Sequence, residues 1–204
     1  MNSEEAATLR FHFGVIVLAA GRSTRMGDKN KLLQPYQGQS IISWVVATAK
    51  LVCPQVFVVT GHQSAQIKSE LTNHAVTFVS NLDYASGLSS SLAAGITALP
   101  PEIDAAIICL GDMPRTKAEH LKNLMDAYDP QHDHSICLPV FSGKRGNPVL
   151  WGHKYFSELT HLKGDKGARD LLNEYHDQVL EVQMDDNSIH FDIDTPAELD
   201  YSKV

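Results

Sequence analysis

Short apolar runs, most of them rich in β-branched residues, alternate along the chain with segments in which apolar residues recur every three or four positions. The short runs predict buried strands, and the periodic segments predict amphipathic helices. The predicted strands are 13–19, 55–60, 75–80, 105–110, 135–140, 149–151, 178–184 and 190–193. The predicted helices are 41–52, 64–71, 92–99, 117–128, 154–162, 168–175 and 197–203. Fully apolar strands that alternate with helices predict an α/β fold, with a mostly parallel sheet covered on both faces.

Polar and breaker residues delimit several of these elements. Ser40 is a good cap for the helix that follows it, and Pro100-Pro101 ends the helix at 92–99. Thr195 and Pro196 are typical of the start of a last helix. Because no break in composition and no internal repeat appears, we expect one domain over residues 1–204, with residues 1–12 as a flexible N-terminal extension.

Composition and charge argue against several classes of partner. The chain has 204 residues, 43% of them hydrophobic, and a formal net charge of −7. An acidic protein lacks the basic face that nucleic acid requires, so we expect no nucleic-acid partner. No apolar run approaches membrane-spanning length, the first residues lack a signal core, and three scattered cysteines argue against a disulfide framework. We therefore expect a cytoplasmic protein with no membrane partner.

A glycine loop follows the first predicted strand and carries two glycines, Gly21 and Gly27. Its four cations are Arg22, Arg25, Lys29 and Lys31. Glycine permits close backbone approach, free N–H groups cradle oxygens and the cations offset charge, so the loop suits a bound polyphosphate. The spacing matches neither common phosphate-binding motif. An ordinary strand-to-helix turn with solvated charges therefore stays open at this point.

Carboxylates and hydroxyls at other strand ends supply further candidates. Asp112 ends an apolar strand, where it suits Mg²⁺ beside a phosphate loop or bonds its own turn. Asp192 and Asp194 share one face of a strand, as helix caps or as metal ligands. The serines at 89–91 head a helix, where they cap it or bond a base or ribose.

Six motifs together resemble the nucleotidyltransferases of the molybdenum-cofactor family. They are Val17-Leu18-Ala19-Ala20-Gly21-Arg22-Ser23-Thr24-Arg25-Met26-Gly27 with Asn30-Lys31-Leu32-Leu33, Gly87-Leu88-Ser89-Ser90-Ser91-Leu92, Gly111-Asp112-Met113-Pro114, Arg145-Gly146-Asn147-Pro148-Val149, Gly164-Asp165-Lys166-Gly167-Ala168-Arg169 and Asp192-Ile193-Asp194-Thr195-Pro196. They occur in the family's order, and the resemblance spans roughly residues 13–200. Each motif alone is weak, whereas the ordered set is specific for the superfamily and favours its molybdopterin cytidylyltransferase branch.

The resemblance implies a Rossmann-like α/β fold with a mixed, mainly parallel sheet. It also implies a Mg²⁺-dependent reaction in which the phosphate of molybdopterin, or of its molybdenum-loaded form, attacks the α-phosphorus of a nucleoside triphosphate and releases pyrophosphate. No protein nucleophile is needed, so catalysis consists of positioning and charge neutralisation. A molybdenum hydroxylase or its chaperone is implied as a further partner.

The same resemblance implies roles for individual residues. Arg25, Lys31 and Asp112 would be catalytic. The nucleotide would contact Leu18, Ala19, Ala20, Gly21, Arg25, Lys31, Gly87, Ser90, Ser91 and Asp112. The acceptor would contact Arg145, Asn147 and Asp165. Asp112 and Asp194 would bind Mg²⁺.

The prediction of the nucleobase depends on a smaller feature of the resemblance. Leu-Ala-Ala-Gly accompanies pyrimidines more often in the relatives, so Ala20 favours CTP. The alternatives are another base or acceptor, such as GTP, ATP, or a sugar or isoprenoid phosphate. A different kind of alternative is a non-catalytic, nucleotide-binding partner that inserts cofactor into molybdenum hydroxylases.

Overall fold

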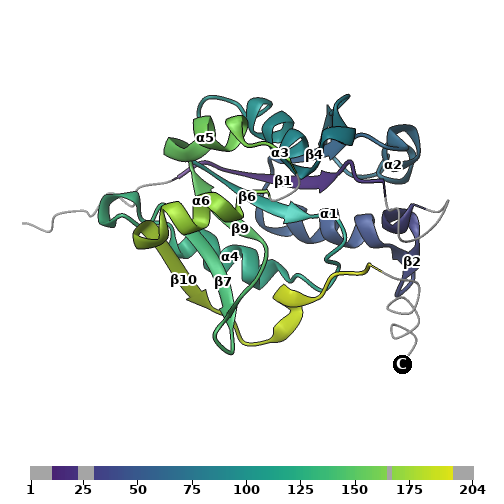
Figure 1. Cartoon of the computed structure of the whole chain (residues 1–204). Helices are drawn as coiled ribbons and strands as arrows, with labels where there is room; N and C mark the ends of the chain where they lie inside the picture. The colour runs from purple at the N-terminus through teal and green to yellow at the C-terminus, as the bar shows by residue number, and fades with distance from the viewer. Residues whose placement is uncertain (1–10, 23–29, 165–166, 195–204) are drawn as a thin grey trace, which may run out of the picture.

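A computed structural model describes residues 11–22, 30–164 and 167–194 (Figure 1). Its ten strands in the described residues are β1 (Phe13–Ala19), β2 (Pro35–Tyr36), β3 (Gln39–Ser40), β4 (Val56–Thr60), β5 (Thr77–Ser80), β6 (Ala105–Leu110), β7 (Ile136–Phe141), β8 (Lys144–Arg145), β9 (Val149–Gly152) and β10 (Val179–Gln183). The α-helices of the same residues are α1 (Ile41–Val52), α2 (Ser64–Glu70), α3 (Leu88–Thr97), α4 (Ala118–Ala127), α5 (Phe156–His161) and α6 (Arg169–Glu174). Strands and helices alternate along most of the chain, which confirms the predicted α/β class.

The main sheet has eight strands in the order β10-β7-β9-β6-β1-β4-β5, with β8 paired to β7. β1 lies between β4 and β6 and is parallel to both. β9 is antiparallel to β6 and to β7, so the sheet is mixed but mostly parallel, as predicted. The parallel strands β1, β4 and β6 therefore end at one edge, where ligands bind in open α/β sheets.

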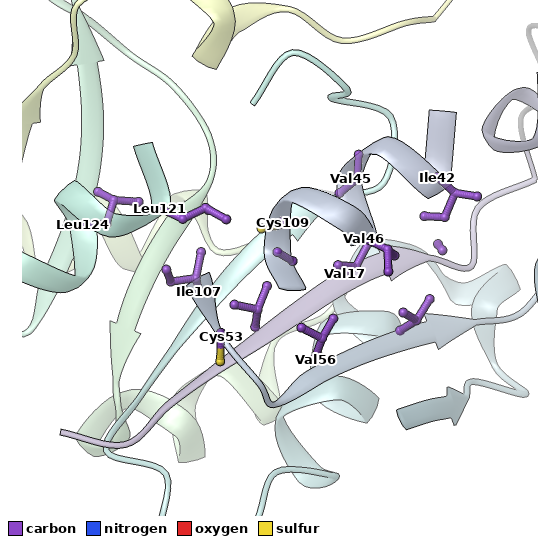
Figure 2. Packing of buried hydrophobic residues seen from close by; sticks show 14 of the residues in the cluster. Val17, Ile42, Val45, Val46, Cys53, Val56, Ile107, Cys109, Leu121 and Leu124 are labelled. Carbon is purple, nitrogen blue, oxygen red and sulfur yellow. The ribbon is translucent and has the colours of Figure 1, made fainter. Parts of the chain in front are cut away.

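Helices cover both faces of the sheet, and the alternation of side chains along β1 explains why. Val15 and Val17 point into a first core cluster, which contains buried residues of α1, α2 and α4. Ile16 and Leu18 point into a second core cluster, which contains buried residues of α3, α5 and α6. Figure 2 shows the first cluster, in which α1 and α4 side chains meet the strands. A strand that is buried on both faces has no polar side, and β1 has none.

Local signals set several element boundaries as predicted. Ser40 caps α1, because its side chain accepts a hydrogen bond from the Ser43 N–H at 3.2 Å. Pro100-Pro101 follows the end of α3. Among the described residues, no helix is long and apolar enough to cross a lipid bilayer.

Three local predictions were wrong. The segment 190–193 is not a strand: it continues from the 3₁₀ turn η7 (Asn187–His190) in irregular conformation. α3 begins at Leu88 and not at 92: the serines at 89–91 lie in its first turn, an N-terminal position as predicted, but its N-cap is Gly87 and not a serine. Phe11 and His12 are not a loose extension, because Phe11 packs 4.9 Å from the Tyr128 ring and the His12 N–H donates to Asp104. The remaining predictions, for 1–10 and for the helix at 197–203, lie outside the described residues.

Candidate functional site

Backbone hydrogen bonds join the ends of β1 and β6 to the segment that follows η7. The Gly111 N–H donates to the Leu18 carbonyl at 3.0 Å, and the Ile193 N–H donates to the Asp112 carbonyl at 3.0 Å. Gly111 permits this approach, since a Cβ there would lie 2.7 Å from the Leu18 oxygen. Three segments that are distant in the sequence therefore meet at the carboxyl edge of the sheet.

Lys31 connects two carboxylates at this edge. Its Nζ lies 2.6 Å from Asp112 Oδ2 and 2.7 Å from Asp194 Oδ1, and the three side chains are only 15%, 19% and 31% exposed. The lysine opens the 3₁₀ turn η2 (Lys31–Leu33), whose cap is the buried Asn30 side chain. The local sequence therefore fixes the lysine, and the tertiary fold brings the two aspartates to it.

The charges of this cluster perturb one another. Burial alone lowers the pKa of the Lys31 ammonium, but the adjacent Asp112 and Asp194 carboxylates outweigh it and raise that pKa above its ordinary value. The pKa of Asp192 is raised, first by desolvation and then by the charges of Asp194 and Asp112. Lys31 is therefore a firmly held cation, and Asp192 is crowded by negative charge.

Three carboxylates can hold a divalent cation here. Asp112, Asp192 and Asp194 each offer an oxygen, and these oxygens lie within 4.8 Å of one another. Oxygens on opposite sides of Mg²⁺ are about 4.2 Å apart, which this spacing nearly matches. In the described part of the chain, Asp112 Oδ1 is inaccessible to solvent and has no hydrogen-bond partner. A bound cation would give this buried oxygen a partner. Three carboxylates and one ammonium leave two negative charges, so the residues fit a divalent ion.

The nucleotide-binding residues predicted at the end of β1 lie beside this cluster. Leu18, Ala19 and Ala20 are buried, and the Ala20 carbonyl accepts a hydrogen bond from the His62 N–H at 3.1 Å. Gly21 is exposed, and a Cβ at this position would meet nothing within 4 Å. Open space next to a fixed backbone is compatible with a bound ligand.

Of the four cations of the glycine loop, Arg22 and Lys31 lie in the described residues. The Arg22 guanidinium is exposed and lies 5.5 Å from the centre of the Tyr84 ring. The predictions for Arg25 and Lys29 lie outside the described residues.

The serines of α3 form a hydrogen-bond network with Asn81. Asn81 Nδ2 donates to Ser90 Oγ at 2.9 Å and to Ser91 Oγ at 3.0 Å. Ser90 Oγ also lies 2.9 Å from the Gly87 carbonyl, and Gly87 has a positive φ of 112°. The network fixes the first turn of α3, and Gly87, just before it, is half-buried.

Two of the three predicted acceptor residues, Arg145 and Asn147, lie on or just after β8. The Asn147 N–H donates to the Ile189 carbonyl at 3.0 Å, which places Asn147 beside η7 and near the acidic segment. Arg145 pairs with Glu181 on β10, with Nε 2.7 Å from Oε1. Asp165 lies outside the described residues. Of this predicted set, Asn147 is therefore the residue attached to the segment that leads to Asp192 and Asp194.

The family described as "MobA-like NTP transferase domain" matches residues 15–179. The chain belongs to this family. The molybdenum cofactor cytidylyltransferase of Escherichia coli (strain K12) is 27% identical over 89% of the chain and 90% of its own length. The purine catabolism protein PucB of Bacillus subtilis (strain 168) is 32% identical over 91% of the chain and 93% of its own length.

Solved structures agree with this assignment at the level of the fold. Rv0371c from Mycobacterium tuberculosis H37Rv superposes with a TM-score of 0.82 at 23% identity, covering 94% of this chain and 97% of its own. A manganese complex of Rv0371c superposes with a TM-score of 0.77 at 22% identity over the same shares. This MobA-like chain is thus a nucleotidyltransferase with a Rossmann-like fold, as the six motifs predicted.

Asp192 belongs to the acidic cluster, although the motifs assigned only Asp194 and Asp112 to the metal. The signal was present in the spacing of Asp192 and Asp194, which predicts a shared face. The segment is not a strand, however, and its irregular backbone still brings both carboxylates to Asp112.

Proposed function

We propose that this nucleotidyltransferase transfers CMP from CTP to the phosphate of molybdopterin, or of its molybdenum-loaded form, and releases pyrophosphate. The relative named molybdenum cofactor cytidylyltransferase covers nearly the whole chain and supports this acceptor and base. The observation that carries the proposal is the Lys31 ammonium held between Asp112 and Asp194 at the end of the glycine loop. A cation beside a set of metal-binding carboxylates suits a triphosphate with its divalent ion.

In this proposal the chain orients the nucleotide through backbone as much as through side chains. Leu18, Ala19, Ala20 and Gly21 face the nucleotide, and Gly87 with the first turn of α3 borders the base and ribose. Because Ser90 and Ser91 already bond Asn81, they hold that turn in place and leave its backbone to meet the ligand. Arg145, Asn147 and Asp165 are assigned to the acceptor.

Lys31 and Arg25 neutralise negative charge that develops as the acceptor phosphate oxygen attacks the α-phosphorus. The bond to the β-phosphate breaks, and pyrophosphate leaves with the electron pair. Such a reaction needs no covalent enzyme intermediate, so positioning and electrostatics supply the rate. Lys31 is held by two carboxylates and does not need to reorganise during the reaction.

Asp112, Asp192 and Asp194 would hold Mg²⁺, which when bound neutralises the phosphates as a Lewis acid. Oxygen ligands are what Mg²⁺ and Mn²⁺ prefer in proteins. One structural neighbour is described as a complex with manganese, which supports a divalent ion in this fold.

A pyrophosphate-release assay tests the proposal directly. CTP, GTP, ATP and UTP are each incubated with Mg²⁺ and one acceptor: molybdopterin, its molybdenum-loaded form, a sugar phosphate or an isoprenoid phosphate. We expect turnover with CTP and a molybdopterin acceptor. Faster turnover with another base or another acceptor would replace the substrate assignment and leave the enzyme class unchanged.

A cofactor-delivery role is the second candidate. The relative named a purine catabolism protein is 32% identical, so relatives of this similarity carry more than one description. Binding of CTP and Mg²⁺ without turnover on any acceptor would favour a partner that inserts cofactor into a molybdenum hydroxylase, or that serves its chaperone.

A further inference from the structure

Three separate chain segments build the charged cluster, and each brings one more residue to a common point beside it. Lys31 is followed by Tyr36 on β2, Asp112 by Arg115, and Asp192 is preceded by Phe191. Arg115 touches both of the others. Its Nε donates to the Tyr36 hydroxyl at 2.9 Å, and its guanidinium carbon lies 3.7 Å from the centre of the Phe191 ring.

One partner of Arg115 is fixed in the core. Tyr36 is 2% exposed, and its carbonyl accepts a hydrogen bond from Trp44 Nε1 at 2.7 Å. Arg115 itself is exposed, so burial does not hold it in place. Tyr36 therefore gives the guanidinium a rigid anchor, and the planar group can stack on an aromatic face.

The other partner belongs to a segment with little regular structure. After η7 ends at His190, residues 191–194 form no strand or helix. Among the described residues, single contacts hold this segment: Ile193 is buried and its N–H bonds the Asp112 carbonyl, and Asp194 bonds Lys31. Phe191 packs at the edge of the first core cluster, and its N–H donates to the Ser188 carbonyl. The stack of Arg115 on Phe191 adds a contact immediately before the two metal-binding aspartates.

Electrostatic attraction to the aspartates does not explain this placement. Within the described residues, Arg115 forms no ion pair with Asp112, Asp192 or Asp194. Its interactions are a stack and a hydrogen bond, both of which fix geometry.

We propose that Arg115 is a positioning residue, whose contacts with Phe191 and Tyr36 hold the carboxylates of Asp192 and Asp194 in register with Asp112 and Lys31. The inference rests on the proposed function, in which these carboxylates hold a divalent ion. Metal sites need ligands fixed by neighbouring groups, because loosely held ligands lose affinity. Arg115 supplies that support to a segment that has no strand or helix of its own.

Amide hydrogen exchange of Ile193 reports on this clamp, formed by Arg115, Tyr36 and Phe191, in the absence of metal and nucleotide. In Arg115→Ala we expect the Ile193 amide to exchange about tenfold faster, the scale of one cation–aromatic stack with one hydrogen bond. Lys68→Ala is the matched control: Lys68 lies 5.9 Å from the Phe78 ring, remote from the site, and its loss should leave Ile193 unchanged. Unchanged exchange in Arg115→Ala would overturn the proposal.

Two further variants separate the clamp from a simple charge and from a folding defect. Arg115→Lys keeps the charge but loses the planar stack, so it should not restore protection, whereas full restoration would contradict the clamp. Tyr36→Phe removes a single hydroxyl from a residue that otherwise stays packed. It should speed exchange about threefold, and no change there would count against the anchor.

Mn²⁺ binding, measured by electron paramagnetic resonance, completes the test. Arg115→Ala and Phe191→Leu should each weaken binding about tenfold, and the double variant no further, because both remove the same stack of Arg115 on Phe191. Additive losses would show that the two residues act independently and would overturn the clamp. If exchange and Mn²⁺ binding change as expected while no acceptor is turned over, the proposed function fails and the clamp stands. If the wild type turns over its acceptor and neither quantity changes in Arg115→Ala, the clamp fails and the proposed function stands.

Discussion

Lys31 Nζ lies 2.6 Å from Asp112 Oδ2, although 81 residues separate the two in the sequence. The same ammonium reaches Asp194, 163 residues away, at 2.7 Å. The cluster is therefore a product of the tertiary fold, and its members are expected to respond to substitution as a unit.

Asp112→Asn should reduce turnover on the order of 100- to 1,000-fold, the usual scale for loss of one electrostatic contact. The amide keeps the shape of the side chain but gives up the negative charge that pairs with Lys31, and it replaces one of the two carboxylate oxygens by an NH₂ group that cannot bind a cation. Pyrophosphate release measures the effect, and circular dichroism checks the fold. Asp185→Asn, an exposed change before η7, serves as the control. Wild-type turnover in Asp112→Asn would remove this residue from the metal site.

Lys31→Met should change metal binding and turnover in opposite directions. Without the ammonium, three carboxylates face one another unneutralised, so Mn²⁺ should bind about tenfold more tightly in the absence of nucleotide. Turnover should fall on the order of 100-fold or more, because the cation for the triphosphate is gone. Weaker Mn²⁺ binding in this variant would mean that the lysine supports the carboxylates and does not compete with the metal.

Asp192→Asn tests whether the third carboxylate is a ligand. Desolvation and the neighbouring charges raise the pKa of Asp192, so neutralising the residue relieves repulsion with Asp112 and Asp194. We expect Mn²⁺ affinity to fall about tenfold while the unfolding midpoint stays level or rises slightly. Isothermal titration with Mn²⁺ and urea unfolding give the two quantities. An unchanged affinity would leave Asp112 and Asp194 as the only two ligands among these three aspartates.

Much of the site and of the fold is encoded in local patterns of the sequence. The order of the motifs predicted Lys31, Asp112 and Asp194, because each sits at the end of an apolar strand or in a family motif. Periodicity likewise predicted β1 and α1 with their observed ends. The segment 190–193 was wrongly predicted as a strand because Ile193 is buried without pairing in the sheet. The contact between Arg115 and Phe191 joins segments that are distant in the sequence, and no local pattern encodes it.

Gly21 and Gly111 are expected to respond to alanine in opposite ways. A Cβ at Gly21 meets only open space, so Gly21→Ala should leave stability within about 0.5 kcal/mol of the wild type. If the nucleotide lies there, its affinity should fall by about 1–3 kcal/mol, the usual cost of an extra methyl in a filled site. At Gly111 the Cβ would lie 2.7 Å from the Leu18 oxygen, so Gly111→Ala should lose stability. Unaltered CTP binding in Gly21→Ala would move the nucleotide away from this loop.

Because two thiols are buried, we expect the free energy of unfolding to fall at alkaline pH. Burial raises the pKa of Cys109 to about 12 and the pKa of Cys137 to about 12. In the unfolded chain a thiol ionises near pH ~8.5, so above that pH the native state alone retains the proton. Protons bound only by the native state make the free energy of unfolding decrease as pH rises, by up to about 1.4 kcal/mol per pH unit and per thiol.

Urea unfolding of the wild type and of Cys109→Ala, from about neutral pH to about pH 10, measures this slope across the thiol's ionisation in the unfolded chain. Cys109→Ala should be less stable near neutral pH because it leaves a cavity, but its stability should fall less steeply with pH. Val17→Ala is the matched control, since Val17 pairs with Cys109 across β1 and β6 and carries no thiol. It should lose packing free energy and keep the wild-type slope. Parallel slopes for the wild type and Cys109→Ala would show that this thiol does not contribute to the alkaline loss.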